Sequence, residues 1–112
     1  MELIIEKGYY LSDASHFVDY HAGLKFEKMN YSALWFLDDI TVMSNGKADD
    51  VIFSKEDFMI SNIKATYELN DEELTVYFNK GGEFEVVRKF HLVQNGQLMD
   101  EDDKFYDFKY WE

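Results

Sequence analysis

Carboxylates are the most numerous side chains in this chain that could do chemistry, because 23 of its 112 residues are Asp or Glu. Clustered carboxylates suit hard cations such as calcium, and paired carboxylates carry out glycosidic acid–base catalysis. The run Asp100-Glu101-Asp102-Asp103 lacks the central glycine and the closing glutamate of an EF-hand loop. A catalytic pair needs one raised and one ordinary pKa, and no pair in the sequence stands out in this way. We therefore expect no metal at this run.

Two histidines and an aspartate lie close together at His16, Asp19 and His21. Imidazole and carboxylate groups are zinc ligands, but residues five apart do not share one face of a helix or of a strand. The chain has no cysteine, so it has no thiol nucleophile, thiolate metal site or disulfide. No serine stands in a Gly-x-Ser-x-Gly elbow, and there is no phosphate-binding glycine loop. We predict a protein that is not an enzyme and that binds neither metal nor cofactor.

The net charge of the chain argues against some classes of partner and favours others. Eleven basic residues against 23 acidic ones give a net charge of -12, and Arg88 is the only arginine. Nucleic-acid binding draws its affinity from Lys and Arg that neutralise phosphates, and anionic membranes attract the same residues. A strongly acidic protein instead attracts a basic protein over long range. We expect a basic protein partner, no nucleic acid and no membrane.

The elements that must position these side chains are strands. Between Asn62 and Val93, apolar residues alternate with polar ones in three segments, which is the two-residue period of half-buried antiparallel strands. Lys80-Gly81-Gly82 supplies the turn between the second and third segments. This meander has one apolar face, and the rest of the chain must cover it.

The flanking segments predict further strands. They cover residues 3–11, broken by a bulge or bend at Gly8, and residues 24–26, 31–37, 40–43 and 105–110. Ser12 to Ser15 caps a short helical turn through residues 16–20 or forms an ordered loop. Residues 49–60 contain a weak capping box at Ser54-Lys55-Glu56-Asp57 and form either a helical turn or a crossover strand. We predict one all-β domain over residues 1–112, a small antiparallel up-and-down barrel or curved sandwich. It has seven to eight strands and at most one or two short helical turns.

Three acidic turns lead to a prediction about binding. If the strands run strictly up and down, alternate turns share one end of the barrel. The predicted rim then holds nine carboxylates, those of Asp38, Asp39, Asp71, Glu72, Glu73, Asp100, Glu101, Asp102 and Asp103. Turns are commonly charged because they are exposed, but nine like charges in one place repel one another, and a basic partner would offset this cost. We assign these residues to partner binding, together with Tyr106 and Trp111 as exposed aromatic anchors.

Aromatic residues make up 18% of the chain, more than one small core easily buries. Several segments resemble the small bacterial lipocalin-like (calycin) domains. They are Gly8-Tyr9-Tyr10, Leu24-Lys25-Phe26, the hairpin from Trp35 to Val42, Lys64-Ala65-Thr66-Tyr67, Glu73-Leu74-Thr75-Val76 and Phe105-Tyr106-Asp107-Phe108. Asp39 stands where family members usually have glycine. The resemblance implies an up-and-down barrel whose mouth admits a small apolar ligand. In that alternative, Trp35, Tyr67, Tyr77 and Phe90 line the cavity.

Together these patterns favour an acidic inhibitor or immunity-type protein that neutralises a basic partner, for example a nuclease toxin. The alternative is a lipocalin-like barrel that binds a small apolar ligand. The start of the chain has no secretory signal pattern, and no apolar run approaches the roughly 20 residues of a membrane helix. With no cysteine in the chain, we expect a cytoplasmic protein. The sequence does not determine the oligomeric state.

Overall fold

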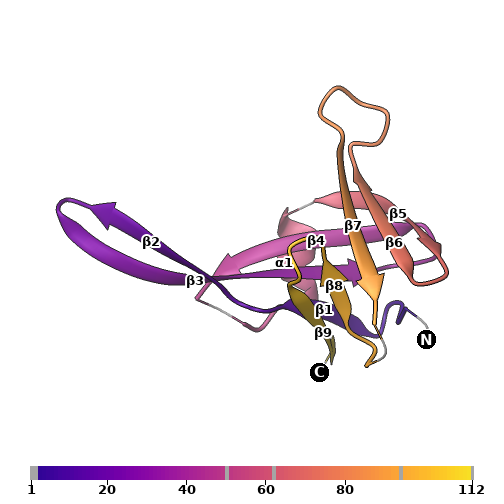
Figure 1. The fold of residues 1–112 in the computed structure, drawn as a ribbon, viewed down its shortest axis with the longest axis horizontal. Helices are drawn as coiled ribbons and strands as arrows, with labels where there is room; N and C mark the ends of the chain where they lie inside the picture. Colours follow the sequence, from indigo (N-terminus) through magenta and orange to yellow (C-terminus); the bar gives the residue numbers. More distant parts are fainter. Residues whose placement is uncertain (1–2, 50, 62, 94, 112) are drawn as a thin grey trace.

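Nine antiparallel strands and one short helix make up the computed structural model, which describes residues 3–49, 51–61, 63–93 and 95–111 (Figure 1). The strands are β1 (Gly8–Ser12), β2 (Ser15–His21), β3 (Leu24–Phe36), β4 (Thr41–Ala48), β5 (Lys64–Asn70), β6 (Glu73–Phe78), β7 (Val86–Leu92), β8 (Leu98–Asp100) and β9 (Phe105–Tyr110). The helix is α1 (Lys55–Ser61). Eight strands close into a barrel, and β2 is an additional strand on β3. The predicted all-β up-and-down barrel is thereby confirmed.

Strand β1 closes the barrel by pairing with β9 on one side and with β3 on the other. Tyr10 stands opposite Phe108 of β9 and opposite Leu34 of β3. Of the strand predicted over residues 3–11, only Gly8–Ser12 is a strand, and the bend lies at Glu6 and Lys7, directly before Gly8. A Cβ at Gly8 would lie 2.0 Å from the carbonyl oxygen of Lys109, so only glycine lets β1 and β9 approach this closely.

The barrel interior is filled with side chains. Alternate residues of each strand point inward, which explains the two-residue period of the sequence. The barrel core consists of Tyr10, Leu34, Phe36, Val42, Ala65, Tyr67, Leu74, Val76, Phe90, Leu92, Leu98 and Tyr106, all buried. Its rings meet edge to face, as Phe36 does with Tyr67 at 4.9 Å and Phe90 with Tyr106 at 5.6 Å between centroids.

A second apolar layer lies outside the barrel. We call it the outer layer; its buried members are Tyr9, Ala33, Met43, Phe53 and Phe58, and Leu11, Tyr31, Trp35, Leu37 and Trp111 pack against them. These residues alternate along β1, β3 and β4 with members of the barrel core. The helix therefore covers the outer face of these strands and makes them apolar on both sides.

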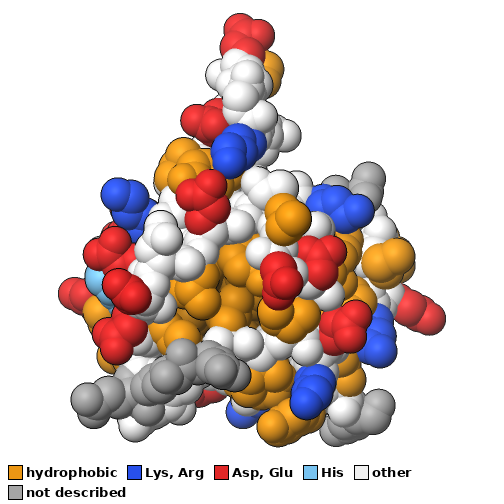
Figure 2. All heavy atoms as spheres, turned by 90° about the vertical axis from the view of Figure 1, so that its right-hand side faces the viewer, with side chains coloured by type: hydrophobic (Ala, Val, Ile, Leu, Met, Phe, Trp, Pro, Cys, Tyr) orange, Lys and Arg blue, Asp and Glu red, His pale blue; other side chains and the backbone are white. Residues whose placement is uncertain are grey.

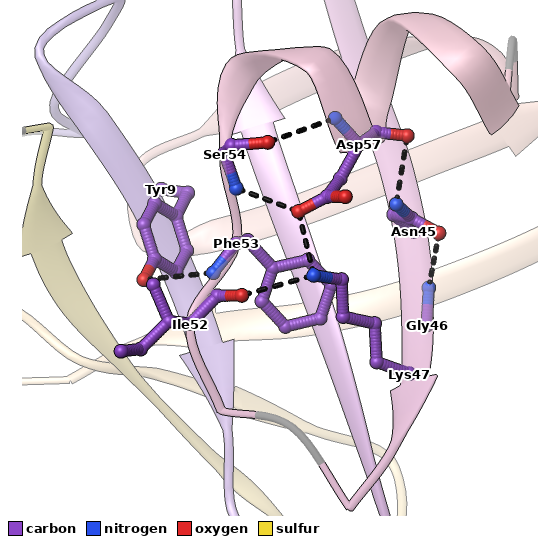
Figure 3. Close-up of polar contacts among 8 residues, drawn as sticks. All are labelled: Tyr9, Asn45, Gly46, Lys47, Ile52, Phe53, Ser54 and Asp57. Carbon is purple, nitrogen blue, oxygen red and sulfur yellow. Dashed lines mark hydrogen bonds and ion pairs between the residues drawn. The ribbon is translucent and has the colours of Figure 1, made fainter.

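Helix α1 begins at the predicted capping box (Figure 3). The Ser54 amide donates to the Asp57 carboxylate at 2.7 Å, and the Asp57 amide donates to the Ser54 hydroxyl at 3.2 Å. Lys47 of β4 contacts both the helix and the segment before it. Its ammonium lies 2.7 Å from the Asp57 carboxylate and 3.0 Å from the Ile52 carbonyl oxygen. Of the two alternatives for residues 49–60, the structure contains the helical turn.

The segment after Ser12 differs from its prediction. Residues 15–21 form strand β2 rather than a helical turn or a loop. Ala22 and Gly23 both have positive φ, 52° and 79°, which gives the two-residue hairpin loop that joins β2 to β3. The segments around Leu24 and Leu34, expected as two strands, are one strand of 13 residues. Its first half and β2 form a two-stranded ribbon that projects from the barrel (Figure 1).

Helix α1, the only helix of the described residues, is too short to cross a membrane.

Candidate functional site

Two of the three acidic turns leave the barrel at the same end. The turn between β3 and β4 carries Asp38 and Asp39, and the turn between β5 and β6 carries Asp71 and Glu72. Strands β4 and β5 are antiparallel neighbours, so the start of β4 and the end of β5 point to one side. We call this region the acidic end; it comprises Asp38, Asp39, Asp71, Glu72 and Glu73, all exposed.

The third acidic turn follows the end of β8 that is farther from the acidic end, so the prediction of one rim of nine carboxylates is wrong. Strand β7 finishes beside the β5–β6 turn, where the Leu92 amide donates to the Glu72 carbonyl oxygen at 2.8 Å. The three-residue strand β8 then runs back along β7, with Asp100 opposite Phe90. This extra reversal carries residues 101–103 away from the acidic end.

At the acidic end, the side chain of Asp38 organises its own turn. Its carboxylate accepts hydrogen bonds from the amides of Ile40 at 2.8 Å and Thr41 at 2.7 Å. These two bonds hold the pKa of Asp38 below its ordinary value. Asp38 is therefore a turn-forming carboxylate, whereas the Asp39 and Ile40 side chains beside it are exposed.

Tyr67 connects the acidic end to the barrel core. Its hydroxyl donates to the carbonyl oxygen of Asp38 at 2.5 Å. Burial raises the pKa of Tyr67 to about 12, and the nearby charges of Asp39 and Asp38 contribute to the same shift. The phenol therefore stays protonated and fixes the turn through its hydrogen bond.

A shallow hollow of about 480 Å³ opens beside Asp39. It is lined by Asp39, Ile40, Thr66, Tyr67, Glu68, Leu69, Asn70 and Lys80. Lys80 reaches back from the β6–β7 turn to the Glu68 carboxylate at 3.5 Å, and both side chains are exposed. Figure 2 faces this end and shows hydrophobic side chains in the middle with acidic side chains on both sides.

The side chains of the third turn mostly stabilise the fold. Asp100 is buried, accepts hydrogen bonds from the amides of Asp102 at 2.9 Å and Lys104 at 3.0 Å, and lies 3.5 Å from the Arg88 guanidinium. Glu101 accepts a hydrogen bond from the Lys89 amide at 2.9 Å. These contacts give Asp100 and Glu101 a role in the fold.

Of the two predicted aromatic anchors, Tyr106 is buried and Trp111 is half-buried. Tyr106 belongs to the barrel core, where burial raises the pKa of its phenol. Trp111 is half-buried in the outer layer and lies 4.8 Å from the ring of Tyr9 and 5.4 Å from that of Trp35. The prediction that Tyr106 is an exposed anchor is therefore wrong, and Trp111 is exposed only in part.

The four aromatic residues of the ligand alternative do not surround one cavity. Tyr67 and Phe90 point into the filled barrel core. Trp35 packs in the outer layer, 5.8 Å from the ring of Phe58. The Tyr77 hydroxyl donates to the exposed carboxylate of Glu68 at 3.3 Å, so this side chain faces outward. The sequence places these residues on strands but does not tell which face a helix will cover.

A larger groove, of about 760 Å³, lies outside the barrel where the chain approaches α1. It is lined by Tyr9, Leu11, Val51, Ile52, Phe53, Ser54, Lys55, Glu56, Lys109, Tyr110 and Trp111. One wall is fixed by Tyr9, whose hydroxyl accepts a hydrogen bond from the Phe53 amide at 3.4 Å (Figure 3). The sequence signal for this groove is the apolar run from Val51 to Phe53, which lies outside any strand.

Among the described residues, no group of three or more His, Asp or Glu side chains has a geometry that could hold a metal ion. His16 and His21 lie on opposite faces of the β2–β3 ribbon, because they are five residues apart on one strand. Comparison with known protein families, with curated proteins and with solved structures finds no significant match for this chain.

Proposed function

We propose that the protein binds a basic protein partner through its acidic end and acts as an inhibitor or immunity-type antagonist. The observation that supports this most is the emergence of two exposed acidic turns side by side on an acidic chain of net charge -12. A nuclease toxin is one class of suitable partner, because a surface that binds phosphate groups is positively charged.

The acidic end combines charge with apolar contact area. Ile40, in the turn between β3 and β4, is 63% exposed. Leu69, near the end of β5, is 37% exposed. Stable interfaces have apolar residues at their centre and polar residues around them. Long-range attraction would speed the encounter with a basic partner, and Ile40 and Leu69 would then contact it directly.

A second candidate function rests on the groove beside α1. Its volume falls within the roughly 300–1,000 Å³ of ligand pockets, and aromatic rings line it. A small apolar ligand would therefore bind outside the barrel, between Phe53 and Tyr110, and not at the four aromatic residues named from the sequence.

The partner proposal is tested by capture from the native cell, with the captured protein identified by mass spectrometry. Asp71→Lys combined with Glu72→Lys reverses two charges of the acidic end. Asp102→Lys combined with Asp103→Lys reverses two charges in the β8–β9 turn, outside the acidic end, and is the matched control, since each pair holds one aspartate with positive φ. We expect a basic protein whose capture by the first variant falls about tenfold or more, the scale of electrostatic steering.

Capture by the control variant should stay near that of the native chain, and capture by the native chain should fall as salt rises. Equal losses in both variants would contradict the proposal, because net charge alone would then account for binding. Recovery of a small molecule without any protein would favour the groove instead.

A further inference from the structure

The β2–β3 ribbon exposes apolar side chains that the barrel does not bury. Its exposed large apolar residues are Val18 and Tyr20 on β2 and Leu24, Phe26 and Met29 on β3. Paired residues share a face, so Val18 lies with Glu27 and Tyr20 with Lys25, while Phe26 lies with Asp19 on the other face. Both faces of the ribbon therefore carry apolar groups into solvent.

The outer edge of β2 is an unprotected strand edge. Among the described residues, β2 pairs with β3 alone, so its other side presents backbone amide and carbonyl groups. Natural proteins protect such edges with lysine, proline or bulges. The seven residues of β2 contain no lysine and no proline, and their register with β3 is unbroken. On β3, by contrast, the corresponding segment carries Lys25 and Lys28.

The ribbon also differs from the rest of the molecule in charge. Residues 15–30 hold two acidic and two basic side chains, so the ribbon is neutral while the whole chain carries -12. A basic partner is therefore steered to the acidic end and not to the ribbon. A second copy of the chain is repelled by every acidic part of the first, and the ribbon is the place where this repulsion is weakest.

We propose that two copies of the protein associate through β2, edge to edge and antiparallel about a twofold axis, to form a four-stranded sheet from two ribbons. A register centred on Val18 pairs all seven residues of both strands. It sets Tyr20 opposite His16 and Asp19 opposite Phe17 of the other copy. A register centred on Asp19 would put two carboxylates opposite each other, which is unfavourable.

The shape of the molecule keeps the two acidic barrels of this dimer apart. The ribbon projects from the barrel along the longest dimension of the molecule, 49 Å (Figure 1). Seven residues of strand span roughly 20 Å at about 3.3 Å each. This exceeds the Debye length of about 8 Å at physiological ionic strength, so most of the repulsion between the barrels is screened. At lower ionic strength the repulsion reaches farther, so the dimer should strengthen as salt rises to this level, whereas salt weakens binding of a basic partner at the acidic end.

Analytical ultracentrifugation of the full chain across concentration and salt tests the proposal. We expect a dimer at micromolar or higher concentration whose dissociation constant falls as salt rises. Val18→Lys adds an edge lysine and should leave a monomer. Val87→Lys is the control, because Val87 on β7 is 41% exposed against 39% for Val18 and gains the same charge. Far-ultraviolet circular dichroism would verify that both variants keep the sheet.

A cross-linking experiment tests the register without changing charge. The chain has no cysteine, so Val18→Cys creates a single thiol. Residues directly opposite on antiparallel strands have Cα atoms roughly 4.5–5.5 Å apart, within disulfide range. We expect rapid formation of a disulfide-linked dimer by Val18→Cys and not by Val87→Cys. A native chain that stays monomeric at all concentrations, or equal cross-linking of the two variants, would overturn the proposal.

Discussion

Replacing Phe58 by alanine should destabilise the outer layer more than any other single change in α1. The Phe58 side chain is 0% exposed, and its ring lies 5.7 Å from Phe53, 5.8 Å from Trp35 and 5.9 Å from Trp111. A helix of seven residues has little stability of its own, so its position depends on this contact.

The expected loss is about 3–5 kcal/mol, the usual cost of Phe→Ala in a core. Since whole domains are stable by roughly 5–15 kcal/mol, this is a large fraction of the total. At about 4 °C per kcal/mol for a chain of this size, Tm should fall by about 12–20 °C. The neighbouring Met59 is 63% exposed, so Met59→Ala should change the free energy of unfolding by no more than about 0.5 kcal/mol.

Thermal and urea unfolding can follow the two apolar layers separately. Both tryptophans of the chain, Trp35 and Trp111, belong to the outer layer, so their fluorescence reports on that layer. Far-ultraviolet circular dichroism reports on the barrel strands. In Phe58→Ala, we expect the fluorescence transition to come first, because the variant loses contacts in the outer layer and none in the barrel core.

Two results would refute this reasoning. A loss below about 1 kcal/mol would mean that the aromatic cluster does not hold the helix, since single surface changes are of that size. A loss as large in Met59→Ala would mean that α1 is stabilised by its helical conformation and not by Phe58.

Two further predictions concern β1 and the capping box. Gly8→Ala should lower the free energy of unfolding by about 1–3 kcal/mol, because the added Cβ would meet the Lys109 carbonyl oxygen. Gly46→Ala should be close to neutral, because its Cβ would lie 3.5 Å from the nearest atom. Urea unfolding of both variants measures the difference. The Lys47 ammonium, followed by the Ser54 amide, holds the pKa of Asp57 below its ordinary value. This contribution to stability is present above the ordinary pKa of about 3.9 and is lost as pH falls through the lower folded value. The native chain should therefore be more stable than Asp57→Asn at neutral pH, and this difference should shrink below about pH 4. A difference between the two urea midpoints that stays constant in acid would contradict this.

The sequence predicted the parts of the fold in which one local pattern dominates. The alternation between Asn62 and Val93 corresponds to β5, β6 and β7, and the Ser54–Asp57 box corresponds to the start of α1. In both places a single requirement acts, either one buried face or one set of free helix amides.

Elsewhere, long-range contacts decided the outcome. Strand β8 has three residues, too few for a period, yet it runs back along β7, so that residues 101–103 turn away from the acidic end. Strand β2 has a mixed pattern because neither of its faces meets a core. Of the candidate site, Asp38, Asp39 and Asp71 to Glu73 could be brought together from turn order alone.

The closure of the barrel by β1 has a consequence for folding. Tyr10 pairs with Phe108, so the two strands that complete the barrel come from opposite ends of the described chain. Contacts between such distant segments form slowly, because the loop between them must lose its entropy first. During synthesis, β9 leaves the ribosome after every other strand of the described chain, so the earlier strands emerge with their apolar faces open. The nascent chain should therefore depend on chaperones until β9 has left the ribosome, and a chain stopped before Phe105 should aggregate.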